Sequence, residues 1–190
     1  MLTDYDWEHD GMDKALERIL PLVQKPARYT GGEYNEIIKD KREVRLRMAF
    51  CFPDVYEIGM SNLGMRILYG CINAEPDIWC ERVFAPWGDM AEQMRENHIP
   101  LYALESGDPV SEFDLIAFTI GYEMSYTNVL NMLRLSGVPL HAADRTGLET
   151  RHRNAQHFAV FGHRAARDAV TFVVEYIHPR LVRQRTPLVF

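Results

Sequence analysis

The sequence predicts an α/β fold, a doubly wound and mainly parallel sheet of the Rossmann-like or flavodoxin-like kind. The first observation is that short, β-rich apolar segments alternate with amphipathic segments over residues 43–140. The second is that segments 44–52 and 113–120 become almost wholly apolar, as in strands covered on both faces. A chain of 190 residues with 47% hydrophobic and 25% charged residues can bury one ordinary core.

The chain begins with a predicted short helix and a connector. Residues 12–20 have apolar side chains at helical spacing, and Pro21 then interrupts the backbone hydrogen bonds of the predicted helix. Residues 25–33 show no periodicity and contain a Gly-Gly pair, so an extended connector is expected. Residues 44–52 then form the first predicted strand, which ends at Pro53.

Four elements are predicted in the middle of the chain. Ser61 and Asn62 can cap a helix over residues 62–73. A short strand at residues 82–85 ends at Pro86 and precedes a helix at 89–97. Residues 99–104 predict a further, weaker strand.

The last predicted unit is a strand, a helix and the start of another strand. Residues 113–120 are apolar apart from Asp114 near the start and Thr119, as is typical of a central strand. Residues 125–136 have helical periodicity and end at Gly137, where a left-handed C-terminus fits. Residues 138–140 predict the next strand.

The pattern of elements and the charge together divide the chain into three segments: 1–42, with the helix and connector; 43–145, the α/β domain; and 146–190, an Arg/His-rich tail. Residues 141–190 contain eight arginines, no lysine and four acidic residues, whereas residues 1–140 hold 13 basic and 23 acidic residues. An insertion, a disturbed reading frame and a truncated end all fit this change in composition. We expect the sheet to be incomplete at its C-terminal side, and its uncovered apolar surface to favour self-association.

Composition excludes several classes of function. A net charge of -6 and a pI of about 5.6 argue against a general nucleic-acid binder, and no recognition module accompanies the arginines of the tail. No segment approaches the roughly 18 apolar residues of a membrane span, and the acidic N-terminus is unlike a signal peptide, so a cytoplasmic protein without membrane contact is expected.

Neither the cysteines nor the histidines predict a metal site. Cys51, Cys71 and Cys80 fit no disulfide framework and no CxxC knuckle, and each is expected to be a small buried residue. The histidines of the tail lack the spacing of a zinc site.

Two polar loops are the candidate functional region. Residues 53–64 follow the first predicted strand and residues 121–128 follow the strand at 113–120. In doubly wound sheets, ligands bind outside the carboxyl ends of the strands, so both loops face the expected crevice. Neither loop matches GxGxxG or the P-loop pattern, which disfavours ordinary nucleotide chemistry. The alternative is that these side chains only cap helices and form turns.

Four blocks of sequence resemble the amino-terminal part of the cobalamin-binding-domain radical SAM proteins. They are RYTGGEYN at 28–35, FPDVYEIGMSNLG at 52–64, ERVFAPW at 81–87 and YEMSYTNVLNML at 122–133. The resemblance implies a B12-binding α/β domain that precedes a radical SAM barrel in the same chain. By that resemblance, a corrin would contact tyrosines through its flat ring and polar residues through its amide side chains. The implied cofactor-binding residues are Asp54, Tyr56, Glu57, Ser61, Asn62, Gly64, Tyr122, Glu123, Tyr126, Thr127 and Asn128.

The departures from this family limit what the chain is expected to do. The CxxxCxxC motif that holds the [4Fe–4S] cluster is absent, so SAM and the cluster belong to the full-length family and this chain alone is not expected to catalyse. No Asp-x-His-x-x-Gly motif is present, so cobalamin would bind without a histidine ligand from it. The alternative function is a non-catalytic α/β interaction domain that has lost the ligand.

Overall fold

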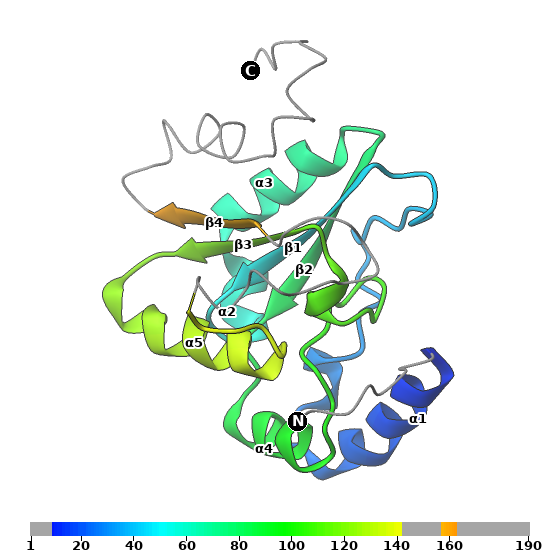
Figure 1. Cartoon of the computed structure of the whole chain (residues 1–190), viewed down its shortest axis with the longest axis vertical. Coiled ribbons are helices and arrows are strands. Elements are labelled where there is room, and N and C mark those ends of the chain that lie inside the picture. The colour runs from blue at the N-terminus through cyan, green and yellow to red at the C-terminus, as the bar shows by residue number, and fades with distance from the viewer. Residues whose placement is uncertain (1–8, 142–156, 163–190) are drawn as a thin grey trace.

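Four parallel strands form the central sheet, in the order β2-β1-β3-β4 (Figure 1). The computed structural model describes residues 9–141 and 157–162. The strands are β1 (Leu46–Phe52), β2 (Ile78–Phe84), β3 (Leu115–Ile120) and β4 (His157–Gly162). Each neighbouring pair is parallel. The predicted doubly wound α/β fold is therefore confirmed.

Helices cover both faces of the sheet. The α-helices of the described residues are α1 (His9–Ile19), α2 (Tyr56–Ser61), α3 (Leu63–Asn73), α4 (Gly88–Glu96) and α5 (Tyr126–Leu135), of which α1 lies away from the sheet (Figure 1). The crossover from β1 to β2 runs in the opposite direction to the crossovers from β2 to β3 and from β3 to β4, so right-handed connections place α3 on one face and α4 and α5 on the other.

The two hydrophobic clusters of the core match these two faces. Met48 and Phe50 of β1 pack in one cluster with Met65 of α3. Ala49 of β1 packs in the other cluster with side chains of α4 and α5, among them Met90. Successive residues of β1 therefore point to opposite faces, and both faces are buried, which explains why the strand is wholly apolar from Met48 to Phe52.

Two predicted strands are wrong. Residues 99–104 are mostly buried but form no strand of the sheet: Leu101 N–H donates to the carbonyl of Leu135, and Tyr102 forms only an isolated bridge to Pro109. Leu104, in a turn, donates one backbone hydrogen bond to the carbonyl of Arg82 in β2. Residues 138–140 form no strand, and the next strand among the described residues is β4 at 157–162.

The sheet continues into the segment that we set apart as a tail. β4 pairs with β3 from Leu115 opposite His157 to Ile120 opposite Gly162, so the sheet extends beyond residue 145. The rest of the tail, residues 146–156 and 163–190, lies outside the described residues, as do the residues between 142 and 145.

Two arginines inside the sheet region hold distant segments together through buried ion pairs. Arg47 of β1 contacts Glu81 of β2 at 2.6 Å and Asp108 at 2.7 Å. Arg82 of β2 contacts Glu105 at 2.5 Å and Glu33 of the connector at 3.0 Å. The second arginine thus fixes both the connector and the segment after residue 99 against the edge of β2.

We expect Gly31→Ala to destabilise the protein more than Gly32→Ala. Both glycines have a left-handed backbone, with φ of 64° and 80°. A Cβ at residue 31 would lie 2.5 Å from the carbonyl oxygen of Leu104, whereas a Cβ at residue 32 meets nothing. The first change should therefore add about 1–3 kcal/mol of overpacking to the backbone strain that both share. Urea denaturation of the two variants measures the difference, and equal losses would contradict the close approach.

Candidate functional site

The strand order brings the two predicted loops together. β1 lies between β2 and β3 and is parallel to both, so the carboxyl ends of β1 and β3 are neighbours. The chain leaves β1 towards one edge of the sheet and β3 towards the other, so this is the topological switch point of the sheet. The loop after β1 leads to α2 and α3, and the loop after β3 leads to α5 on the other face. A hydrogen bond of 2.9 Å from Asn128 Nδ2 to the carbonyl of Pro53 joins them directly.

A pocket of about 320 Å³ opens at this edge of the sheet. The loop after β1 contributes Asp54, α5 contributes Asn128 and Asn131, and α4 contributes Arg95. The segment between β2 and α4 supplies the apolar wall, with Trp87. The pocket therefore combines one carboxylate, one guanidinium, two amides and an indole.

Only some of the residues that line this pocket were predicted from the sequence. Asp54 and Asn128 are the two predicted site residues that line it. Trp87, Arg95 and Asn131 were missed because they follow β2 or lie within helices rather than in the two polar loops. Trp87 lies in the segment that follows β2 and is the last residue of the block ERVFAPW, and this position was the signal available in the sequence.

The predicted residues Tyr56 and Glu57 have contacts within the protein. Glu57 pairs with Lys25 at 3.0 Å and with Arg28 at 2.9 Å, and these cations lower the pKa of its carboxyl group to about 2. Arg28 also lies over the ring of Trp87, 5.6 Å from its centroid. Tyr56 packs edge-on against Phe84, and burial raises the pKa of its phenol. Glu57 thus attaches the connector to α2, and through Arg28 to the pocket wall.

Ser61, Asn62 and Gly64 lie at the junction of α2 and α3. Asn62 Oδ1 accepts a hydrogen bond of 2.9 Å from the N–H of Met65, as an N-cap residue does. Ser61 Oγ donates to the carbonyl of Ile58. A Cβ at Gly64 would meet the Asn62 side chain at 3.3 Å. The expected 53–64 loop is therefore interrupted by α2, and its polar side chains support two helix ends.

We expect Asn62→Ala to cost about 1 kcal/mol of stability through loss of the α3 cap. The matched control is Ser61→Ala, because Ser61 is exposed and its side-chain hydrogen bond to the carbonyl of Ile58 is accessible to water. That change should stay within about 0.5 kcal/mol of the parent. Thermal denaturation followed by circular dichroism separates the two, and equal stability of both variants would contradict the cap.

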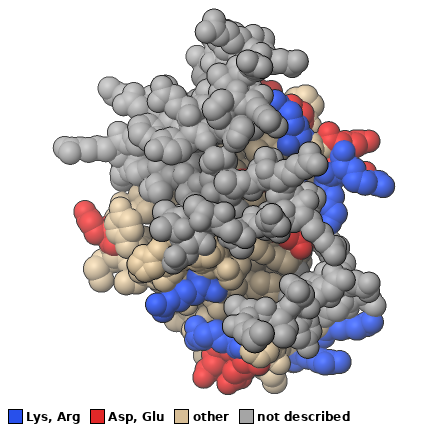
Figure 2. Space-filling model, in the orientation of Figure 1, with Lys and Arg blue, Asp and Glu red and all other residues tan. Residues whose placement is uncertain are grey.

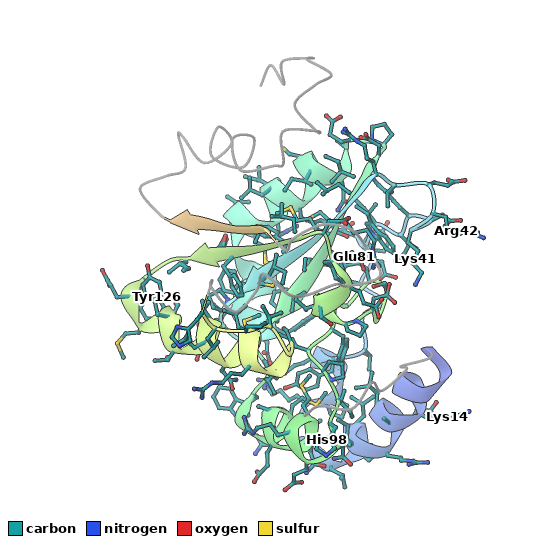
Figure 3. The ribbon with its side chains drawn as sticks, viewed as in Figure 1. Lys14, Lys41, Arg42, Glu81, His98 and Tyr126 are labelled. Carbon is teal, nitrogen blue, oxygen red and sulfur yellow. The ribbon has the colours of Figure 1, made fainter. Side chains whose placement is uncertain are left out.

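The loop after β3 exposes its aromatic side chains. Tyr122 and Tyr126 are 52% and 56% exposed, and Glu123 is exposed between them. Thr127 Oγ1 donates to the carbonyl of Met124 at 3.1 Å. Figure 3 shows Tyr126 at the first turn of α5, beside the carboxyl end of β3. These tyrosines are available to a ligand and do not belong to the core.

Exposed apolar side chains concentrate at this edge of the sheet. We call the set that follows the carboxyl ends of β1, β2 and β3 the apolar rim. It consists of Ile58, Trp87, Tyr122, Met124 and Tyr126. In Figure 2 a broad uncharged area lies over α5, with charged side chains gathered below it. Exposed apolar side chains gathered at one edge of a sheet are typical of a ligand or protein contact.

The cysteines are placed apart. Cys51 and Cys80 are buried in β1 and β2, and burial raises the pKa of both thiols. Cys71 is exposed on α3, so the expectation that all three are buried is wrong for this one. Within residues 9–141 and 157–162, no three His, Cys, Asp or Glu side chains come together as metal ligands.

Comparison with known families adds one finding. Residues 64–152 match the family described as radical SAM proteins, N-terminal. The match spans α3, β2, α4, β3 and α5, and therefore includes the loop after β3 and most of the pocket wall. It supports the radical SAM family for this chain.

No curated protein and no solved structure matches the chain. In the part of the chain that the structure describes, no helix has the length and apolar character needed to cross a membrane.

Proposed function

We propose that this chain is the N-terminal, cobalamin-binding-type module of a radical SAM protein. The corrin lies at the carboxyl edge of the sheet, between residues 53–64 and 121–128. The observation that carries this proposal is the apolar rim with its exposed tyrosines, placed where β1 and β3 diverge and beside a polar pocket.

The side chains present at this edge suit a corrin. A flat macrocycle can pack on the rings of Tyr122 and Tyr126, and its peripheral amides can bond to Asp54, Asn128 and Asn131. The pocket is small for a whole corrin, so it takes a peripheral group while the ring lies on the rim.

Among the residues that the structure describes, no histidine is part of this proposed site. His98 and His141 follow α4 and α5, which run back from the carboxyl edge. The chain therefore holds the corrin through its ring and its amides. The bound cobalamin supplies the cobalt chemistry, while SAM and the iron–sulfur cluster belong to a barrel domain of the longer protein.

A second candidate function is a non-catalytic α/β interaction domain. It is favoured by the polar candidates Glu57, Ser61, Asn62 and Thr127, which all bond within the protein. On this view the apolar rim contacts a protein and no corrin is bound.

Corrin retention tests the proposal. The purified chain is mixed with hydroxocobalamin, desalted, and measured for corrin absorbance. We expect retained absorbance, weakened about tenfold in affinity by Tyr126→Ala and by Tyr122→Ala, since a stacked ring is worth about 1 kcal/mol or more. Tyr34→Ala is the matched control, because Tyr34 is a fully exposed tyrosine in the connector. A colourless eluate, or equal losses in all three variants with circular dichroism unchanged, would favour the interaction domain.

A further inference from the structure

The connector holds Trp87 from outside the pocket. The guanidinium of Arg28 lies over the indole, 5.6 Å from the ring centroid. The phenol oxygen of Tyr29 accepts a hydrogen bond of 3.2 Å from the backbone N–H of Trp87. Trp87 lines the pocket, whereas Arg28 and Tyr29 do not. The ring that forms the apolar wall is therefore held by two consecutive residues that touch no other part of that pocket.

Arg28 and Tyr29 are themselves fixed by contacts with other elements. The Arg28 side chain is only 13% exposed, and its Nε lies 2.9 Å from a carboxylate oxygen of Glu57 in α2. The carbonyl of Tyr29 accepts a hydrogen bond of 2.9 Å from the hydroxyl of Tyr102. A planar guanidinium donates to a carboxylate in its own plane while an aromatic ring packs on its face. Glu57 thus orients the guanidinium, and the guanidinium orients the indole.

Trp87 is a side chain whose order matters for binding. It is 50% exposed, and as the N-cap residue of α4 its side chain makes no capping hydrogen bond. Where a half-exposed side chain is ordered only when a ligand packs on it, the ordering lowers the affinity. Contact with Arg28 orders the indole in the free protein, so this wall of the pocket is preorganised.

We propose that Arg28 is a positioning residue of the candidate site, which acts through Trp87 and touches no ligand itself. Its effect on affinity rests on the corrin function proposed above, whereas its effect on the orientation of the indole needs no ligand. Glu57, which the sequence resemblance places against the corrin, then supports the site indirectly by holding Arg28.

Lys25 provides a matched comparison for Arg28. It pairs with the same carboxylate, 3.0 Å from Glu57 Oε1, but it is 60% exposed. The cation over the ring of Trp87 is that of Arg28. Lys25→Ala therefore removes one cation from Glu57 and leaves the contact with the indole in place.

Quenching of Trp87 fluorescence by acrylamide tests the orientation without a ligand. The emission of Trp87 is the difference between each chain and its Trp87→Phe counterpart. We expect Arg28→Ala to raise the quenching constant and to shift the emission to longer wavelength, because one face of the ring is uncovered. Arg28→Lys should also raise quenching, since it keeps a cation beside Glu57 without a planar group over the ring. Lys25→Ala should match the wild type, and unchanged quenching in both Arg28 variants overturns the proposal.

A double-mutant cycle tests the effect on the site. The affinity for hydroxocobalamin is measured for Arg28→Ala, Trp87→Ala and the double variant, with circular dichroism as the check on folding. We expect Arg28→Ala to weaken binding about three- to tenfold, the cost of ordering one side chain, and to have no further effect once Trp87 is replaced. An equal loss in both backgrounds would show that Arg28 supports the connector in general, and overturns the proposal. If the wild-type chain retains no corrin, the corrin function fails, and the quenching result alone decides whether Arg28 positions the ring.

Discussion

Replacing Arg82 with alanine is expected to lower the free energy of unfolding by about 3–5 kcal/mol, because it leaves buried carboxylates without their cation. The Glu105 side chain is fully buried, and Glu33 is nearly so. The guanidinium also lies over the ring of Tyr69, 4.7 Å from its centroid. Denaturation of the purified variant by guanidinium chloride measures the loss in free energy of unfolding.

A double variant separates the cost of an orphaned charge from the value of the ion pair. Arg82→Met combined with Glu105→Leu removes the Arg82–Glu105 pair and fills the space with apolar atoms, and leaves only the less buried Glu33 without its cation, so it should be more stable than Arg82→Ala. Arg42→Ala, which removes an exposed ion pair with Asp40, should have little effect. If the double variant is less stable than the single one, the buried pair is itself the main stabilising feature.

The stability of the folded chain is expected to fall as the pH rises from about 4.5 to about 7. Glu105 and Glu33 share the one guanidinium of Arg82, and burial raises the pKa of Glu105 from 4.5 to about 7. The folded state therefore binds a proton more tightly than the unfolded state. This contribution is complete below pH 4.5 and is lost as the pH passes through the folded pKa, for a total of up to about 3 kcal/mol.

Glu105→Gln tests the source of this pH dependence. The amide cannot titrate, so the decline between pH 4.5 and 7 should be reduced in the variant. Urea denaturation at closely spaced pH values measures it. A wild-type profile that is flat or rises over this range would show that Glu105 stays ionised in the fold.

The periodic elements were predictable because their pattern follows from local geometry. The helices expected at 62–73, 89–97 and 125–136 correspond to α3, α4 and α5 within a residue or two. The strand expected at 99–104 failed because an apolar extended segment can bond outside a sheet, here to the end of α5. α2 was missed because Gly59 indicates a loop locally, whereas in the fold its bare Cα accommodates the ring of Phe84.

The candidate site was only partly predictable, since its residues come from elements far apart in the chain. Tyr122 and Tyr126 lie exposed at the expected edge, and Asp54 and Asn128 line the pocket. The ion pairs of Glu57 depend on Lys25 and Arg28, about thirty residues earlier, and no sequence spacing indicates them. Nor does any local pattern show that Arg95 and Asn131 would line the same pocket.

Hydrogen–deuterium exchange with and without hydroxocobalamin tests the proposed corrin site most directly. Ligand contact slows amide exchange where it closes local opening of the backbone. We expect slower exchange in residues 53–64 and 121–128, and no change in the connector around Tyr34. Unchanged exchange in both loops, or protection confined to another part of the chain, would contradict a corrin site at the carboxyl edge of this sheet.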